Sequence, residues 1–247
     1  MTQFSSDAVV LRVWPVNEAD LVVSFFTRDY GKLKGVAKAA LKSRKRFGGS
    51  LEVMTEVRAF FADRPRQELV RLDHFDLVRS PLSQPVDYLR AATLSYYAEA
   101  LDEVLPDHDP ERAVFRLLTA VLEHSSAEQP WVATTYFSLW LTRLMGWLPE
   151  LSGCTLCGRS FADSEASFHP GSDGLHCEAH RLGSGAVLCA DSLRMAQRML
   201  REPLGEFAGE AWPRRRGQDL RRFTVESLER HLERRLRSAE ALRRLSQ

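Results

Sequence analysis

The sequence predicts an α+β protein, with strands in the first third of the chain and helices in the remainder. Three observations lead to this prediction: closely spaced apolar runs up to residue 80, helical apolar spacing from residue 81 onward, and two pairs of metal-binding residue types at about 150–188. The 247 residues are enough for two modest domains. We therefore expect domains at 1–80 and 81–247, with a metal-binding module inserted in the second.

Five apolar runs of strand length occupy the first domain. They are rich in Val, Leu and Phe, and turn-forming residues such as Pro15 and Gly48-Gly49 separate them. The predicted strands are 8–14, 21–27, 31–38, 51–61 and 68–78. No stretch with the apolar spacing of a helix separates these runs. We therefore expect a small closed β-barrel, for which the oligonucleotide-binding fold (OB-fold) is the obvious candidate.

Strict alternation in the first predicted strand would place Trp14 on one face with Val10 and Arg12. The opposite face would carry Val9, Leu11 and Val13. An aromatic side chain in a small barrel is usually part of the core. A tryptophan beside an arginine can instead be a platform on which a nucleobase stacks, and both interpretations stay open.

A basic stretch at 30–49 contains no acidic residue, although the formal net charge of the chain is only +1. In its first half, alternation places three lysines on one strand face; its second half is interpreted as a mobile loop without a buried side. We predict a DNA-binding surface here, and the alternative is a solvated face that keeps the protein soluble. The candidate residues are Lys32, Lys34, Lys38, Lys42, Arg44, Lys45 and Arg46.

Helical spacing begins after Pro81 and Pro85. Asp87 is the expected N-cap of the first helix, and Asp109-Pro110 signals the start of a second. Pro130 should open a third helix, which Gly146 ends. The apolar stripes of these helices are most simply core.

Two short pairs of soft ligands follow the third helix. Cys154 and Cys157 are separated by 19 residues from Cys177 and His180, and four such side chains can meet at one tetrahedral zinc ion. Because four protein ligands leave no open position for water, the zinc would be structural. The open alternatives are His176 or His169 in place of His180, Cys189 as the fourth ligand, or a redox Cys-x-x-Cys without metal.

The C-terminal part is predicted to be helical. Cys189 is expected to be a buried thiol, Asp191-Ser192 to cap a helix, and one final helix to run from about Asp219 through Ala239. The arginines of this part are candidates for a second DNA-binding patch, and the alternative is a plain solvated helix face, which Glu and Arg three or four residues apart often form. Its candidate residues are Arg214, Arg215, Arg216, Arg221 and Arg222.

Several classes of protein are disfavoured. A nucleotide-driven enzyme should contain a Gly-x-x-x-x-Gly-Lys-Ser/Thr loop and a nuclease should contain clustered carboxylates, and neither pattern occurs. No apolar run approaches 18 residues and no secretion leader is recognisable, so we expect no membrane segment. The four cysteines fit metal binding in a reducing cytoplasm.

Several motifs, in order and spacing, resemble the RecO family of bacterial recombination mediators over nearly the whole chain. They are Val9-Val10-Leu11-Arg12, Thr27-Arg28-Asp29-Tyr30-Gly31-Lys32, Ser43-Arg44 to Phe47-Gly48-Gly49, Leu144-Met145-Gly146-Trp147-Leu148-Pro149 before Cys154, and His231-Leu232-Glu233-Arg234-Arg235-Leu236-Arg237-Ser238. Zinc-bearing members generally carry Cys-x-x-Cys twice, so His180 is a departure that weakens the assignment of the fourth ligand.

The resemblance implies a cytoplasmic DNA-repair protein that acts at the bacterial nucleoid. It implies an OB-fold, a helical domain and a zinc module, and binding of single- and double-stranded DNA with annealing of complementary strands. It also implies two partners, RecR and single-strand binding protein, and through them an indirect role in loading RecA. The rival interpretation is a zinc-containing protein that binds RNA or acts in translation, because the same barrel and basic stretch suit either nucleic acid.

Overall fold

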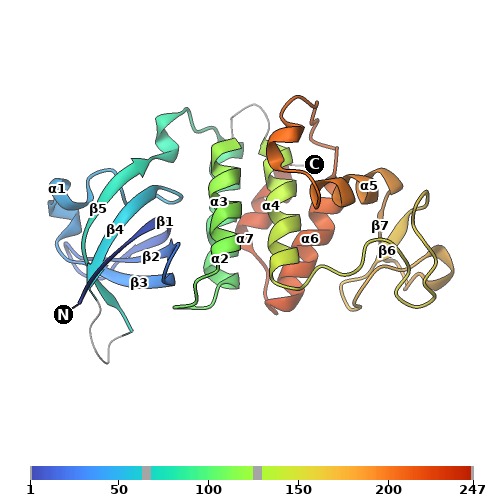
Figure 1. Ribbon diagram of the computed structural model, residues 1–247, viewed down its shortest axis with the longest axis horizontal. Helices are drawn as coiled ribbons and strands as arrows, with labels where there is room; N and C mark the ends of the chain where they lie inside the picture. Colours follow the sequence, from blue (N-terminus) through green and yellow to red (C-terminus); the bar gives the residue numbers. More distant parts are fainter. Residues whose placement is uncertain (1, 63–67, 125–129, 246–247) are drawn as a thin grey trace. The chain divides into compact units, whose positions relative to one another are not determined.

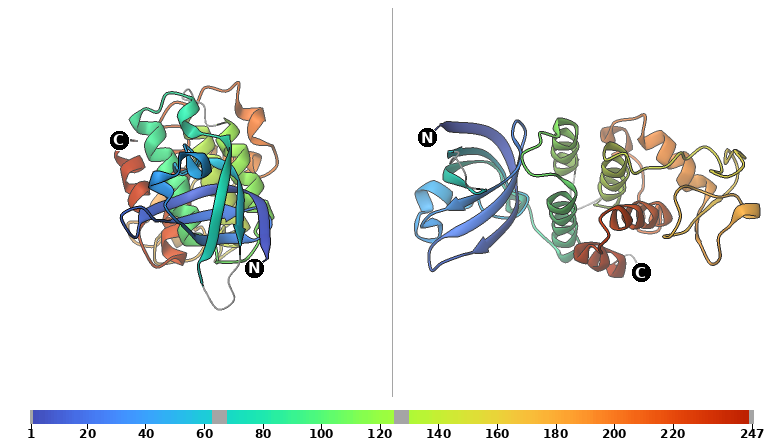
Figure 2. Two further views of the ribbon diagram at one scale, coloured as in Figure 1. Left: turned by 90° about the vertical axis from the view of Figure 1, so that its left-hand side faces the viewer. Right: turned by 90° about the horizontal axis from the view of Figure 1, so that it is seen from below.

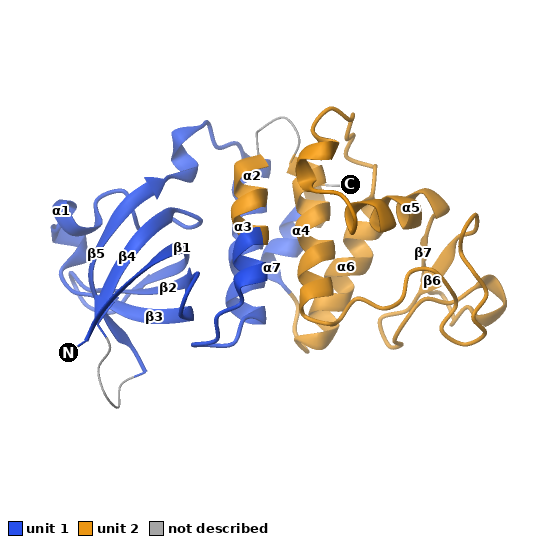
Figure 3. Ribbon diagram, in the orientation of Figure 1, with its two compact units in different colours: residues 1–116, 236–242 blue, residues 117–235, 243–247 orange. Residues whose placement is uncertain are grey.

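The structure, a computed structural model, describes residues 2–62, 68–124 and 130–245. It has a strand-rich N-terminal part and a helical C-terminal part, which confirms the α+β prediction. The chain divides into two compact units, one made of Met1–Arg116 with Leu236–Leu242 and the other of Leu117–Arg235 with Arg243–Gln247 (Figure 3). The domain boundary expected after residue 80 stays a prediction.

Five strands in the described part of the first unit form a sheet that closes on itself (Figure 1). Their pairing order is β1-β2-β3-β5-β4, and β4 returns to β1 with antiparallel pairing. The strands are β1 (Gln3–Pro15), β2 (Leu21–Thr27), β3 (Gly31–Ala37), β4 (Glu56–Ala62) and β5 (Val70–Arg79). The fourth strand starts later than expected because the chain turns at Met54, whose φ is 65°.

Large apolar side chains fill the inside of this sheet, among them Phe25, Phe61 and Phe75. The strict alternation expected in the first strand is wrong. A bulge between Val10 and Arg12 shifts the register by one residue, so that Val10 and Val13 both face the core. Since Trp14 follows Val13 along the strand, its side chain points to the outside of the sheet.

Helices cover part of the outer face of the sheet in this unit. All residues of β2 are buried: Leu21, Val23 and Phe25 lie in the sheet core, and on the outer face Ser24 and Phe26 contact α2 (Tyr88–Val104) and the start of α3 (Arg112–His124). The ring of Phe26 lies 5.5 Å from that of Phe115, and Ser24 Oγ donates to Asp102 at 2.6 Å. Asp87 caps α2, as the sequence predicts, by accepting from the Arg90 N–H at 2.7 Å. The short helix α1 (Arg44–Phe47) lies on the side of the sheet away from α2 (Figures 1 and 2).

The second unit is built around the packing of α4 (Pro130–Leu144) on α6 (Gln218–His231). The start and end predicted for the third helix agree with α4, and Gly146 follows it with a φ of 74°. The single final helix is wrong: α6 ends at His231, Glu233 adopts a φ of 54°, and α7 (Arg237–Leu245) begins afterwards. The expected cap at Asp191-Ser192 is also wrong, because Cys189 is the N-cap of α5 (Ala190–Met199).

The remaining elements are short. They are β6 (Ala166–Phe168) paired with β7 (Ala186–Leu188), and the 3₁₀ helices η1 (Ala40–Lys42), η2 (Pro81–Ser83), η3 (Glu178–His180) and η4 (Leu204–Phe207). Within the described ranges, no helix combines the length and apolar character that a membrane span requires.

Candidate metal centre and nucleic-acid interface

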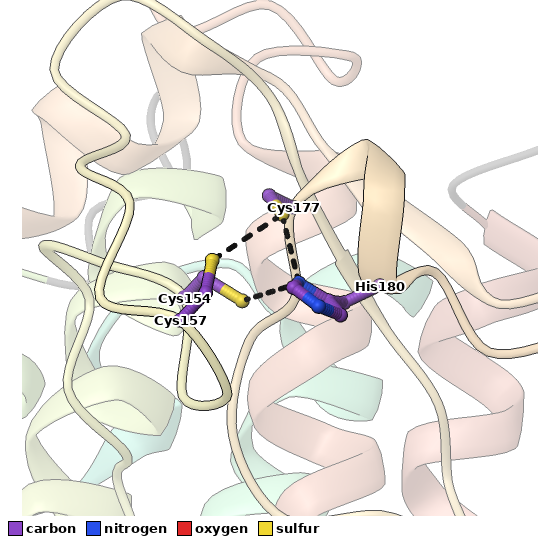
Figure 4. Close-up of side chains that lie close together, drawn as sticks. All are labelled: Cys154, Cys157, Cys177 and His180. Atoms are coloured by element: carbon purple, nitrogen blue, oxygen red, sulfur yellow. Dashed lines mark hydrogen bonds between the residues drawn. The ribbon is translucent and has the colours of Figure 1, made fainter.

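The four predicted metal ligands meet at one point in the second unit. The ligand atoms of Cys154, Cys157, Cys177 and His180 all lie within 4.8 Å of one another (Figure 4). Cys157 Sγ is 3.9 Å from Cys177 Sγ, and His180 Nδ1 is 3.7 Å from Cys154 Sγ and 3.3 Å from Cys177 Sγ. The Cys154 and Cys177 side chains are buried, whereas Cys157 is exposed.

Two tight turns bring the ligand pairs together. In the first, the Gly158 N–H donates to Cys154 O at 2.8 Å, and Gly158 has a φ of 71°, which glycine adopts without strain. In the second, Cys177 precedes η3 and the His180 N–H donates to Cys177 O at 2.9 Å. A bond from Thr155 N–H to Leu175 O at 2.9 Å ties the turns to each other. These backbone hydrogen bonds therefore hold the four side chains so that their ligand atoms face one another.

This geometry fits a tetrahedral metal with soft ligands. Zinc–sulfur bonds of about 2.3 Å require sulfur atoms about 3.8 Å apart, close to the 3.9 Å between Cys157 and Cys177. Burial raises the pKa of Cys154, but backbone N–H groups of Cys177, Leu156 and Cys157 outweigh it and lower that pKa to about 6. The thiolate, which is the form that binds metal, is thus favoured at Cys154.

The alternative ligands lie outside this cluster. His169 Nδ1 accepts from the Gly171 N–H at 3.0 Å, and His176 is buried and pairs through its backbone with Ser167. Cys189 is exposed, so the expectation of a buried thiol is wrong; its Sγ lies 3.4 Å from Ser192 Oγ. Among the described residues, the fourth member of the cluster is His180.

The basic stretch of the first unit divides into exposed and buried cations. We define the basic surface as the four residues whose side chains are exposed: Lys38, Lys42, Arg44 and Lys45. They lie on and around η1 and α1, beyond the end of β3. Arg46 is half-buried and braces this segment, because its Nη2 donates to Lys38 O at 2.5 Å and its Nε to Ser43 Oγ at 3.0 Å.

The segment that carries the basic surface has a buried side, so the interpretation as a loop without one is wrong. Phe47 is 3% exposed, and its ring lies 5.8 Å from that of Phe75 in the sheet core. At the other end, the Ala39 N–H donates to Asp20 Oδ1 at 2.7 Å. No sequence pattern indicates this anchor, because Phe47 is a lone aromatic after three consecutive basic residues.

Lys32 lies inside the protein rather than on the basic surface. Its side chain is 8% exposed, and its Nζ donates to Asp102 O and lies 3.2 Å from Asp107 Oδ1. Lys34 is half-buried and donates to the other Asp107 oxygen at 3.1 Å. Burial raises the pKa of Asp107, but the hydrogen bonds and charges of Lys34 and Lys32 outweigh it and hold that pKa below 3.8. Sequence reasoning missed Asp102 and Asp107 because they lie about seventy residues from their lysines, with no local signal.

The candidate second patch is largely occupied by internal contacts. Arg221 is buried: it donates to Thr135 Oγ1 and to the carbonyls of Arg214 and Arg216, and its guanidinium lies 4.8 Å from the Trp131 ring centre. Arg216 pairs with Glu210 at 2.5 Å, and Arg222 with Glu226 at 2.7 Å. The side chains of Arg214 and Arg215 are exposed.

Comparison with known proteins identifies relatives for both parts of the chain. The family models for recombination protein O match at residues 1–81 (N terminal) and 85–240 (C terminal). The chain is 52% identical over 231 residues to the DNA repair protein RecO of Koribacter versatilis, covering 94% of each protein. It is 33% identical over 239 residues to that of Anaeromyxobacter sp. strain K, covering 96% of this chain and 94% of the relative. The chain therefore belongs to the RecO family of DNA repair proteins.

Proposed function

We propose that this protein is a recombination mediator that binds single- and double-stranded DNA and anneals complementary strands. The observation that carries the proposal is the basic surface: four exposed cations on a segment anchored at both ends to a closed sheet. We assign that sheet to the OB-fold, which commonly binds single strands. Lys34 and Arg46 lie at the edge of the surface, and Arg214 and Arg215 are candidates for a secondary contact. We leave Lys32 out because its charge is buried and paired.

The chemistry required of such a mediator is non-covalent. Exposed lysines and arginines neutralise phosphates and release condensed counterions, so binding depends little on sequence. With phosphate repulsion screened, two complementary strands can approach and pair. No bond is broken in this process, and we accordingly assign no catalytic residue.

The metal centre has a structural role in this proposal. Three cysteines and a histidine form a complete ligand set for zinc, and they join two turns of a segment with only one small sheet, β6 with β7. When bound, zinc would supply folding free energy. The residues that would hold it are Cys154, Cys157, Cys177 and His180.

The partners that we propose are those that the resemblance to the RecO family implies. We propose that the chain works with RecR to help RecA displace single-strand binding protein from DNA, in the cytoplasm at the nucleoid. No feature of the described residues assigns the surface that either partner would use.

Annealing of two complementary oligonucleotides, one with a fluorophore and one with a quencher, tests the proposal. The purified chain should accelerate annealing without ATP, and the variant with Lys42, Arg44 and Lys45 changed to Ala should lose most of this acceleration. Competition with RNA of the same sequence tests the rival function. Failure to accelerate DNA annealing, together with a preference for RNA, would refute the assignment.

A further inference from the structure

The outer face of the closed sheet carries the indole ring of Trp14, to which the proposed function assigns no role. Val13 packs against the core, so Trp14 faces outward, and its side chain is half-buried. Trp14 pairs with Val22, and Val22 pairs with Val36 on the next strand. Directly opposed residues share a face of a sheet. Trp14, Val22 and Val36 therefore form a row across β1, β2 and β3.

This row lies beside the basic surface. Lys34 stands two positions before Val36 on β3, so alternation places both on one face of the sheet, and Lys38 follows directly after the strand ends at Ala37. The turn after β1 also holds the basic segment: Ala39 N–H donates to Asp20 Oδ1 at 2.7 Å and Leu41 N–H to Ala19 O at 3.3 Å. A chain that follows the cations of the basic surface thus comes within reach of the indole ring.

A second planar group accompanies the ring. The Arg12 guanidinium lies 5.6 Å from the centre of the Trp14 ring, in the range of a cation–π contact. The Arg12 side chain is 65% exposed, and its nearest acidic partner, Asp102, is 3.9 Å away. Both guanidinium and indole groups stack on nucleobases.

We infer that Arg12 and Trp14 form a stacking platform for an unpaired base of single-stranded DNA, while the basic surface holds the adjoining phosphates. This inference rests on the proposed DNA binding and adds to it a contact with bases. Since every base has a π face, the contact tolerates any sequence. Bases inside a duplex are already stacked, so the platform favours single strands over duplex.

An oligothymidine and an abasic oligonucleotide of the same length separate base contacts from phosphate contacts. Trp14→Leu should weaken binding to oligothymidine on the order of tenfold and leave binding to the abasic strand and the salt dependence unchanged. Trp14→Phe, which keeps an aromatic ring, should restore most of the loss. The matched control is Phe60→Leu, which removes another half-buried outer ring of the same sheet, stacked 4.2 Å from that of His74; it should bind both strands like the wild type.

The outcomes distinguish this inference from the function on which it rests. If the wild type binds neither strand, the proposed DNA binding fails. If the wild type binds both and Trp14→Leu weakens both equally, or neither, the platform is overturned while phosphate binding stands. An equal loss in Phe60→Leu on oligothymidine would also overturn the assignment to Trp14.

Discussion

Two basic side chains, those of Lys32 and Arg221, are almost fully buried and are held by backbone carbonyl oxygens. Burial lowers the pKa of Arg221 to about 10, so this side chain remains charged at neutral pH. A buried charge is costly unless it is compensated: Lys32 pairs with Asp107, and Arg221 donates to two carbonyl oxygens and to Thr135 Oγ1. Their charges therefore hold the fold together and are withdrawn from any contact with DNA phosphates.

The pair of lysines on Asp107 predicts an acid-sensitive stabilisation of the first unit. The pKa of Asp107 is lowered in the folded state. Its contribution to the free energy of unfolding is therefore present above pH 3.8 and is lost as the pH falls through the folded pKa. Asp107→Asn should lower the free energy of unfolding at pH 7, and the difference from the wild type should shrink below about pH 4. Urea unfolding across this range measures the difference.

A suitable control for that experiment is Asp76→Asn, because Asp76 is 65% exposed and its ion pair with His74 spans 3.9 Å. This variant should unfold like the wild type at every pH. A difference for Asp107→Asn that stays constant from neutral to acid pH would contradict the predicted link between Asp107 ionisation and stability.

The metal centre predicts a contrast between two cysteines. Cys177→Ser should lose bound zinc and lower the melting temperature of the second unit by roughly 5 °C or more, because metal binding free energy is also folding free energy. Cys189→Ser should retain the bound zinc and the wild-type melting temperature, since Cys189 lies outside the cluster. Metal analysis and thermal unfolding measure the two effects. Retention of stoichiometric zinc in Cys177→Ser, or its loss in Cys189→Ser, would show that the ligand set is wrong.

At the scale of elements, local signals predicted much of the fold. The cap at Asp87, the bounds of β2 and the extent of α4 could be recognised because each depends on a few adjacent residues. The break between α6 and α7 could not, because the apolar spacing continues through Leu232 and Leu236 while the backbone turns at Glu233. The bulge in β1 was hidden for the same reason, as Val9, Val10 and Leu11 are all apolar and fit either register.

The anchoring of α1 predicts a strong effect of one apolar residue. Phe47→Ala should cost about 3–5 kcal/mol of unfolding free energy by leaving a cavity beside Phe75, whereas Phe47→Leu should cost less than about 1.5 kcal/mol. Leu41→Ala, at a side chain 62% exposed on the same segment, should stay within about 0.5 kcal/mol of the wild type. Chemical denaturation measures all three, and equal stabilities of Phe47→Ala and Leu41→Ala would contradict the buried anchor.

At the scale of the molecule, the grouping of the metal ligands could be predicted from the sequence more accurately than the exposure of the basic side chains. Few residue types bind zinc, and they occur in closely spaced pairs along the chain. The cluster of Cys154, Cys157, Cys177 and His180 could therefore be anticipated. Exposure depends on partners distant in sequence. Lys32 and Arg221 are buried by contacts with Asp107 and Thr135, which no pattern around either residue reveals.

The salt dependence of single-strand binding shows whether the basic surface contacts DNA phosphates. We expect log affinity for oligothymidine to fall linearly with log salt. Changing Lys42, Arg44 and Lys45 to Ala should make this slope shallower by about two units, at roughly 0.7 per lost contact. A control with Arg159, Arg201 and Arg235 changed to Ala removes the same charge from exposed positions of the second unit and should keep the wild-type slope. Equal slopes for the wild type and the first variant would contradict the claim that the basic surface binds DNA.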